Sequence, residues 1–353
     1  MPKTLAWKAK PRNHRTNMPL THGLWTRRDV NLAARSGRMD FRKGGIVMKE
    51  LPKRTLGRTG LLVTQLGFGA MEIRGHRIWN GRPCTDAQAK TILDAVLDKG
   101  INFIDTANDY GKSELYMGRY LADRRDRFYV ATKCGCHMTY AGNHDETPHV
   151  WTRENLLRNI ADSLLKMQTD YVDILQLHNP GVDECEKNKL ADVLRELRDM
   201  GAVRFIGCSS TSPHLATYIA WGCFDTFQIP YSALQRQHEH LITKAGEAGA
   251  GVIIRGGVAQ GEPGVARGRD GGHWNRFERA KLDELRGSGE SRTAFLLRFT
   301  LTHPHCHTTI VGTLLPEHLE ENVTTVLRGP LPRDDYEEAK KRLDAIGETP
   351  EQA

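Results

Sequence analysis

Apolar runs of strand length alternate with longer segments of helical periodicity from Lys53 onward. The eight runs cover residues 66–70, 102–106, 128–132, 172–178, 203–208, 226–231, 251–255 and 308–312. Before them, residues 54–65 have the pattern of a β-hairpin, with short runs on either side of the turn Gly57-Arg58-Thr59-Gly60. The pattern therefore predicts a hairpin followed by alternating strands and helices.

The segments between the apolar runs carry the end signals of helices. Thr85 and Gln88 have the spacing of a capping box, and Gly100 follows the last apolar position of that segment. Thr152 is placed to cap a second helix, and Pro316 stands where the first turn of another should begin. One helix between successive strands implies right-handed βαβ connections and a parallel sheet.

Two architectures accommodate these units. We expect an α/β fold in which the strands close into a (β/α)8 TIM barrel with an N-terminal β-hairpin. The competing architecture is a doubly wound open sheet, whose dinucleotide-binding members carry Gly-x-Gly-x-x-Gly after the first strand. The first strand here gives Gly67-Phe68-Gly69-Ala70-Met71-Glu72, which lacks the third glycine and leads directly into no helix. This departure favours the barrel.

Positive charge is concentrated near the N-terminus. Residues 1–47 hold eleven Lys and Arg and two acidic residues, a net charge of +9, whereas the whole 353-residue chain carries +7. The remainder is slightly acidic, so it lacks the basic face that nucleic-acid binding needs. We expect residues 1–47 to form a disordered basic extension and residues 48–353 to form the barrel, with Met48 as the natural beginning.

Composition bears on compartment and metal content. The sequence holds no run of about 18–20 apolar residues, so it predicts no membrane helix. Seven cysteines in a long chain indicate a reducing compartment rather than a disulfide framework, and we expect a cytoplasmic protein. Cys134-Gly135-Cys136 and the histidine-rich residues 303–307 have no clear partners to complete a zinc site, so we expect no metal.

Titratable residues follow three neighbouring strands at the end where barrel enzymes carry their chemistry. The second strand ends at Asp105 and leads to Tyr110, the third leads to Lys133, and the fourth ends at His178. A neighbouring ammonium lowers the pKa of a phenol, and a carboxylate keeps that ammonium charged. A histidine can hold a carbonyl oxygen by a hydrogen bond. Together the four side chains predict proton donation to a carbonyl that receives a hydride, which a nicotinamide cofactor must supply.

The segments around these residues resemble the signatures of the aldo-keto reductase superfamily. They are Phe103-Ile104-Asp105-Thr106-Ala107, Tyr110-Gly111-Lys112-Ser113-Glu114, Tyr129-Val130-Ala131-Thr132-Lys133 and Asp170-Tyr171-Val172-Asp173 with His178. The hairpin is also similar to that family, and the resemblance runs from about Lys53 to Leu327. The resemblance implies a (β/α)8 barrel in which Tyr110 donates the proton and Lys133 and Asp105 tune the acidity of the Tyr110 hydroxyl. It also implies that His178 orients the substrate carbonyl.

The resemblance also implies residues for the nicotinamide and pyrophosphate. Ser209 and Gln228 match family positions that hold the carboxamide, although the neighbouring Asn position is Ser210 here. Arg255 stands where the family usually places an aromatic side chain against the nicotinamide, and a guanidinium plane can stack on a ring. Gly256 begins a glycine-rich loop, residues 255–274, that could fold over the pyrophosphate.

Residues after the eighth strand resemble the adenosine end of the family's site. The predicted residues, with Tyr231 from the sixth strand, are Gly312, Thr313, His318, Glu321 and Asn322, the last two reading the adenine. Family members that prefer NADP carry Lys or Arg here, whereas this chain has His318. Because histidine at its usual pKa of about 6.5 is mostly neutral at pH 7, it holds a phosphate weakly. We expect NADPH to be favoured and NADH to be accepted.

Trp79 and Trp274 lie in loops after the first and seventh strands, where we expect the walls of the substrate pocket.

The leading interpretation is an NAD(P)H-dependent carbonyl reductase whose partner is a small-molecule aldehyde or ketone. One alternative is a catalytically weak, cofactor-binding regulatory subunit resembling the potassium-channel β subunits. Another is a nucleic-acid-binding adaptor that acts through residues 1–47. The complete set of four polar residues favours the enzyme, while the substrate and the oligomeric state stay open.

Overall fold

The computed structural model describes residues 50–265 and 272–351, so the predicted extension over residues 1–47 and the middle of the glycine-rich loop lie outside the described residues. Eight parallel strands close into a barrel in the order β10-β11-β12-β3-β4-β5-β8-β9. They are β3 (Leu66–Gly69), β4 (Phe103–Asp105), β5 (Tyr129–Cys134), β8 (Val172–His178), β9 (Val203–Ser209), β10 (Thr226–Pro230), β11 (Gly251–Arg255) and β12 (Thr308–Val311). The predicted (β/α)8 barrel is confirmed, and the open sheet is excluded.

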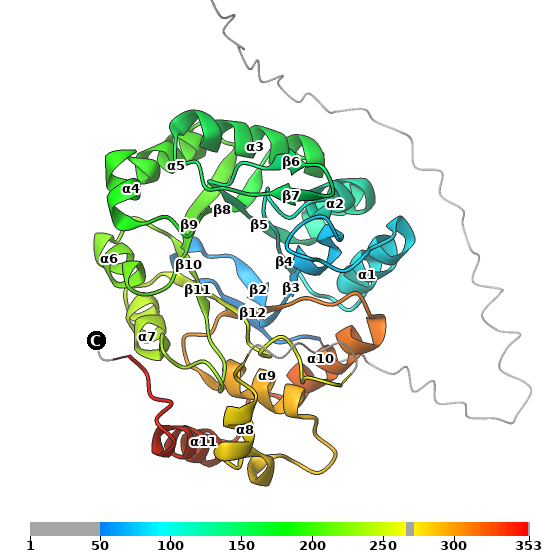
Figure 1. Ribbon diagram of the computed structural model, residues 1–353, viewed down its shortest axis with the longest axis vertical. Helices are drawn as coiled ribbons and strands as arrows, with labels where there is room; N and C mark the ends of the chain where they lie inside the picture. Colours follow the sequence, from blue (N-terminus) through cyan, green and yellow to red (C-terminus); the bar gives the residue numbers. More distant parts are fainter. Residues whose placement is uncertain (1–49, 266–271, 352–353) are drawn as a thin grey trace, which may run out of the picture. The chain divides into compact units, whose positions relative to one another are not determined.

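Helices surround the barrel (Figure 1). They are α1 (Asp86–Asp98), α2 (Ser113–Leu121), α3 (Arg153–Met167), α4 (Val182–Lys187), α5 (Leu190–Asp199), α6 (His214–Trp221), α7 (Glu239–Glu247), α8 (Asn275–Arg279), α9 (Arg292–Thr302), α10 (Pro316–Arg328) and α11 (Arg333–Ala345). The expected caps are present. Thr85 and Gln88 form the capping box of α1, the Thr152 hydroxyl accepts a hydrogen bond from the Asn155 backbone, and Pro316 lies in the first turn of α10.

The predicted hairpin closes the N-terminal end of the barrel. Its strands β1 (Lys53–Thr55) and β2 (Leu62–Thr64) pair antiparallel around the short helix η1 (Gly57–Thr59). Gly57 has φ +49°, and a Cβ there would lie 2.3 Å from the backbone nitrogen of Gly251, so the turn contacts the start of β11 as only glycine allows. The hairpin contributes Leu56, Leu61 and Val63 to one buried cluster with barrel residues. A site for small molecules is therefore left to the opposite end, where the strands finish.

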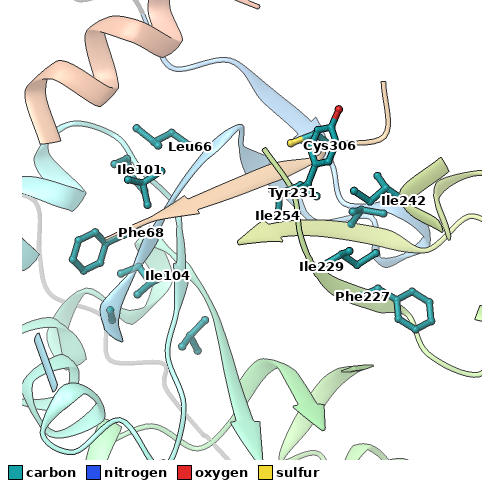
Figure 2. Packing of buried hydrophobic residues seen from close by; sticks show 14 of the residues in the cluster. Leu66, Phe68, Ile101, Ile104, Phe227, Ile229, Tyr231, Ile242, Ile254 and Cys306 are labelled. Carbon is teal, nitrogen blue, oxygen red and sulfur yellow. The ribbon is translucent and has the colours of Figure 1, made fainter. Parts of the chain in front are cut away.

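The barrel has two apolar layers. Phe103 belongs to the cluster shared with the hairpin, whereas the next residue, Ile104, belongs to the larger core beneath the helices. Ile253 and Ile254 divide in the same way, as successive side chains of a strand point to opposite faces. Figure 2 shows part of the larger core, where Ile242 of α7 lies near β10 and β11. Strands buried on both faces give the near-continuous apolar runs seen in the sequence.

The longer connections all follow the C-terminal ends of barrel strands. The short 3-10 helices η2 (Ala70–Arg74) and η4 (Leu282–Leu285) lie in such connections, after β3 and β11, whereas η3 (Ala122–Arg127) lies between α2 and β5. The small antiparallel sheet of β6 (Thr139–Ala141) and β7 (His144–Glu146) follows β5. Within the described residues no helix combines the length and apolar character needed to cross a bilayer.

Candidate active site

The four polar residues predicted to act together meet at the C-terminal end of the barrel. Asp105 is the last residue of β4, Lys133 lies near the end of β5, and His178 ends β8. Tyr110 lies in the loop after β4, and its backbone nitrogen donates to the carbonyl of Ala107. Parallel pairing places these strand ends side by side, because β4 pairs with β5 and β5 with β8.

Lys133 and Asp105 form a buried ion pair. Lys133 Nζ lies 2.6 Å from Asp105 Oδ1 and donates to the Thr106 carbonyl at 2.8 Å. Gln176 and Gln228 donate their amide hydrogens to the other oxygen, Asp105 Oδ2, at 3.2 and 2.7 Å. Burial lowers the pKa of Lys133, but Asp105, Tyr110 and Asp109 together outweigh burial, and the pKa lies above its ordinary value. The lysine is therefore a fixed cation.

Tyr110 lies directly against this cation. Lys133 Nζ is 4.9 Å from the centre of the Tyr110 ring, and only 7% of the tyrosine is exposed. Burial raises the pKa of Tyr110 and Lys133 lowers it, and the net result is a raised pKa. Lys133 lowers the pKa of Tyr110 as expected, but desolvation of the phenolate exceeds the attraction of the ammonium.

A cavity of about 430 Å³ opens beside Tyr110. The predicted residues that line it are Asp105, Tyr110, Gln228, Arg255, Gly256, Gly312, Thr313, His318, Glu321 and Asn322. They come from β4, β10, β11, β12 and α10 and the loops that follow these strands. The structure therefore brings together residues predicted for the chemistry and for both ends of a dinucleotide.

Arg255 ends β11 and lines the cavity without a partner among the described residues: its guanidinium makes no hydrogen bond or ion pair there. Burial lowers its pKa from the ordinary value, partly offset by Tyr110 and Asp105. A half-buried cation without a counter-ion is unfavourable, so this position suits an anionic or electron-rich ligand.

The floor of the cavity includes two glycines that approach each other closely. A Cβ on Gly312 would lie 2.6 Å from the carbonyl oxygen of Gly69, so a side chain is excluded there. Near the far end, the Ser291 hydroxyl donates to Glu321 Oε1 at 2.7 Å and ties the start of α9 to α10. Sequence reasoning did not single out Ser291, because nothing local to it signals its distance from α10.

Six predicted residues do not line the cavity, and two of them, Lys133 and His178, lie against Tyr110. Ser209 is buried at the end of β9, and Trp79 is 46% exposed with its ring edge-on to Tyr110 at 5.8 Å. Trp274 donates its indole hydrogen to the Ala259 carbonyl at 3.1 Å and so braces the loop after β11. Tyr231 is fully buried, its hydroxyl 2.9 Å from that of Tyr336. The structure therefore places Tyr231 in the packing between β10 and α11, away from the cofactor cavity.

A model of the aldo/keto reductase family matches residues 65–344, most of the chain. The chain belongs to the aldo/keto reductase family. It is 26% identical over 290 residues to the uncharacterized oxidoreductase YqkF of Bacillus subtilis, covering 77% of this chain and 90% of that protein. It is 31% identical over 208 residues to the NADH-specific methylglyoxal reductase of Escherichia coli, covering 55% of this chain and 62% of that protein.

A solved structure agrees with this assignment. The holo form of the aldo-keto reductase AKR11C1 from Bacillus halodurans superposes with a TM-score of 0.72 at 26% identity, covering 83% of this chain and 96% of that chain. Membership of the aldo/keto reductase family means oxidoreductase chemistry on small-molecule carbonyl compounds with a nicotinamide cofactor.

Two residues of this aldo/keto reductase that were given no role in the predicted site contact His178. His178 Nδ1 lies 3.4 Å from Asp109 Oδ1 and 3.5 Å from Cys136 Sγ. Burial raises the pKa of Asp109, but His178 outweighs it and the pKa lies below its ordinary value. Asp109 immediately precedes Tyr110, and Cys136 follows β5, so only the closure of the barrel brings both beside the end of β8.

Proposed function

We propose that this aldo/keto reductase transfers a hydride from NADPH or NADH to an aldehyde or ketone, with Tyr110 as proton donor, and catalyses the reverse reaction on the alcohol. One observation carries the proposal. A buried phenol stands against the Lys133–Asp105 ion pair in the wall of a cavity large enough for small molecules. The bound nicotinamide supplies the hydride, which no side chain of the protein can provide.

Tyr110 and Lys133 divide the proton chemistry between them. Because burial raises the pKa of Tyr110, the phenol is neutral at neutral pH and has a proton to give. When the carbonyl oxygen takes that proton, the fixed ammonium of Lys133 stabilises the phenolate left behind. Asp105 acts as a positioning residue, since it holds Lys133 Nζ at 2.6 Å.

His178 would orient the carbonyl. Its ring lies edge-on to Tyr110, with ring centres 6.1 Å apart, so both side chains can reach one oxygen atom between them. Its Nδ1 faces Asp109 and Cys136, which leaves Nε2 as the nitrogen available to a substrate. This arrangement fixes the ring before the substrate arrives.

The cavity supports a dinucleotide as the second reactant. Arg255 offers a half-buried cation without a partner among the described residues, and Gly69 and Gly312 allow close backbone approach. Glu321 and Asn322 line the end proposed for the adenine. His318 is the residue proposed nearest a 2′-phosphate, so we propose that NADPH is favoured and NADH accepted. The Escherichia coli relative is an NADH-specific methylglyoxal reductase, which supports assaying both cofactors.

The seven cysteines are all free thiols, which supports action in the reducing cytoplasm.

The proposal is tested with a panel of aldehydes and ketones, following the loss of reduced-nicotinamide absorbance with NADPH and with NADH. We expect turnover with at least one carbonyl class, and Tyr110→Phe should abolish it while cofactor binding persists. Tight cofactor binding with negligible turnover across the panel would contradict the proposal and indicate the regulatory-subunit alternative. The His318→Ala variant tests the cofactor preference, since a strong preference for NADPH that survives it excludes a role for His318.

A further inference from the structure

Three side chains able to bind a metal meet beside the proposed catalytic residues. Asp109, Cys136 and His178 each offer one donor atom, and these atoms all lie within 4.8 Å of one another. Asp109 is 1% exposed and Cys136 3% exposed. The sequence predicted no metal site, because Cys136 has no donor at zinc-binding spacing along the chain. Barrel closure supplies the two donors that the local sequence lacks.

Hydrogen bonding does not account well for this cluster. Both carboxylate oxygens of Asp109 are buried, and within the described residues neither has a hydrogen-bond partner. The separation of 3.4 Å between Asp109 Oδ1 and His178 Nδ1 exceeds the 2.7–2.9 Å or so of a charge-assisted hydrogen bond. The buried carboxylate therefore has one long ion pair, to His178, and no hydrogen bond of ordinary geometry within the described residues, so it can accept a further ligand.

The two donor separations measured from His178 Nδ1 match the edges of a tetrahedral metal site. Zinc binds nitrogen and oxygen at about 2.0–2.2 Å and sulfur at about 2.3 Å, which places tetrahedral nitrogen and oxygen donors about 3.4 Å apart and nitrogen and sulfur about 3.5 Å apart. The observed values are 3.4 Å between Nδ1 and Oδ1 and 3.5 Å between Nδ1 and Sγ. These two separations fit one ion bound at His178 Nδ1, and the third, between the Asp109 oxygen and Cys136 Sγ, lies within the 4.8 Å that contains all three donor atoms.

The backbone that carries the donors is already held in place. The amide hydrogen of Gly135 bonds to Asn159 Oδ1 at 2.8 Å, and Asn159 Nδ2 donates to the Cys136 carbonyl at 3.0 Å. On the other side of the cluster, Asn108 donates its backbone hydrogen to the Lys133 carbonyl at 3.3 Å and its side-chain amide to Ser163 at 3.1 Å. Donors on a rigid frame bind a metal with little cost in ordering.

We propose that Asp109, Cys136 and His178 form a binding site for one zinc-like divalent cation, with water as the fourth ligand. The mixed nitrogen, sulfur and oxygen donor set favours Zn²⁺ over Mg²⁺ or Ca²⁺, which take oxygen donors. A thiolate and a carboxylate neutralise the two positive charges, so the occupied site can stay buried. Binding through Nδ1 leaves the hydrogen of His178 on Nε2, the tautomer that donates a hydrogen bond.

The test measures metal binding directly, so its outcome does not depend on the proposed reductase activity. The full-length protein is stripped with a chelator, dialysed, and titrated with Zn²⁺ in competition with a chromophoric chelator. We expect one Zn²⁺ per chain, with affinity at least about tenfold weaker in Asp109→Asn and in Cys136→Ser. The matched control is Cys84→Ser, because Cys84 lies outside the cluster and donates only weakly to the Thr85 carbonyl. This variant should bind like the unmodified chain.

Cobalt substitution gives the second readout. Co²⁺ bound at this site should show the thiolate charge-transfer absorption and the strong visible bands of a tetrahedral complex, and both should vanish in Cys136→Ser. Thermal unfolding confirms that each variant is folded. If Cys136→Ser is unstable, Asp109→Asn still tests the site, because asparagine keeps the shape of the aspartate side chain. The proposal is overturned if the stripped protein takes up no Zn²⁺. It is also overturned if Asp109→Asn and folded Cys136→Ser bind Zn²⁺ as tightly as the unmodified chain.

Discussion

Asp105 and Lys133 make an ion pair of 2.6 Å in which both side chains are buried, with exposed fractions of 2% and 1%. Two glutamines donate to the remaining carboxylate oxygen, so the aspartate is fully hydrogen-bonded. Such a pair is costly to break, because removing one charge leaves the other buried without compensation. Since Tyr110 lies against the lysine, the position of the ammonium determines how well the phenolate is stabilised.

Replacing Asp105 with asparagine tests this dependence. Asp105→Asn preserves the side-chain shape and removes the charge that holds Lys133, so kcat should fall by about two orders of magnitude or more while cofactor binding changes much less. Steady-state kinetics and the quenching of protein fluorescence by cofactor separate the two effects. Asp192→Asn, which removes an exposed ion pair with Arg195, is the charge-matched control and should retain full activity. An Asp105→Asn enzyme with unchanged kcat would exclude the positioning role.

Arg255 should contribute to cofactor affinity. Arg255→Gln removes a half-buried cation that has no protein partner among the described residues. Binding of NADPH and NADH should therefore weaken by roughly tenfold, the equivalent of one charge-assisted hydrogen bond. Cofactor titration followed by fluorescence measures the change. Lys341→Gln removes the same charge from a side chain that is 82% exposed and should leave affinity as it is. Equal affinity in both variants would show that the guanidinium faces no part of the cofactor.

Glu114 should make stability depend on pH. Burial raises the pKa of Glu114 from 4.5 to about 7, partly offset by the hydrogen bond from Thr132. The folded chain therefore holds a proton that the unfolded chain releases between those values, and stability falls as the pH rises through this window and levels off above it. The loss amounts to about 3 kcal/mol.

The Glu114→Gln variant checks this slope, because a neutral amide cannot titrate and can still accept the hydrogen bond of Thr132. Urea unfolding gives the free energy of unfolding of both proteins at several pH values. As the pH is raised, this free energy should increase in the variant relative to the unmodified chain, and the difference should reach a plateau above neutral pH. Comparison at each pH cancels the contribution of His303 and His307, whose burial lowers each pKa to about 4 and gives the opposite slope. Parallel curves for the two proteins would contradict the buried proton.

Tyr231 distinguishes a packing role from a cofactor role. Tyr231→Phe leaves the buried hydroxyl of Tyr336 without its partner, so the free energy of unfolding should drop by about 1–3 kcal/mol. The KM for either cofactor should stay constant, because the hydroxyl faces α11 rather than the cavity. Unfolding curves and steady-state kinetics provide the two measurements. A raised KM with an unchanged free energy of unfolding would contradict the packing role and indicate that Tyr231 contacts the cofactor.

Much of the architecture was predictable because its signals are local. Thr85, Thr152 and Pro316 mark helix ends through contacts with residues a few positions away, and these ends are observed. Strands buried on both faces appear as apolar runs, which is why all eight were visible. Asp105, Lys133 and His178 could be placed at one end of the barrel because parallel strands align their carboxyl ends.

The sequence by itself therefore determined the order of the elements, the barrel, and the set of polar side chains at its open end, since all of these depend on neighbours along the chain. Only the tertiary structure decided the raised pKa of Tyr110, the place of Tyr231 beside a residue 105 positions away, and the meeting of Asp109, Cys136 and His178. Burial and side-chain contact depend on segments that are distant in sequence. Closing the barrel creates these contacts, and no local pattern encodes their distances.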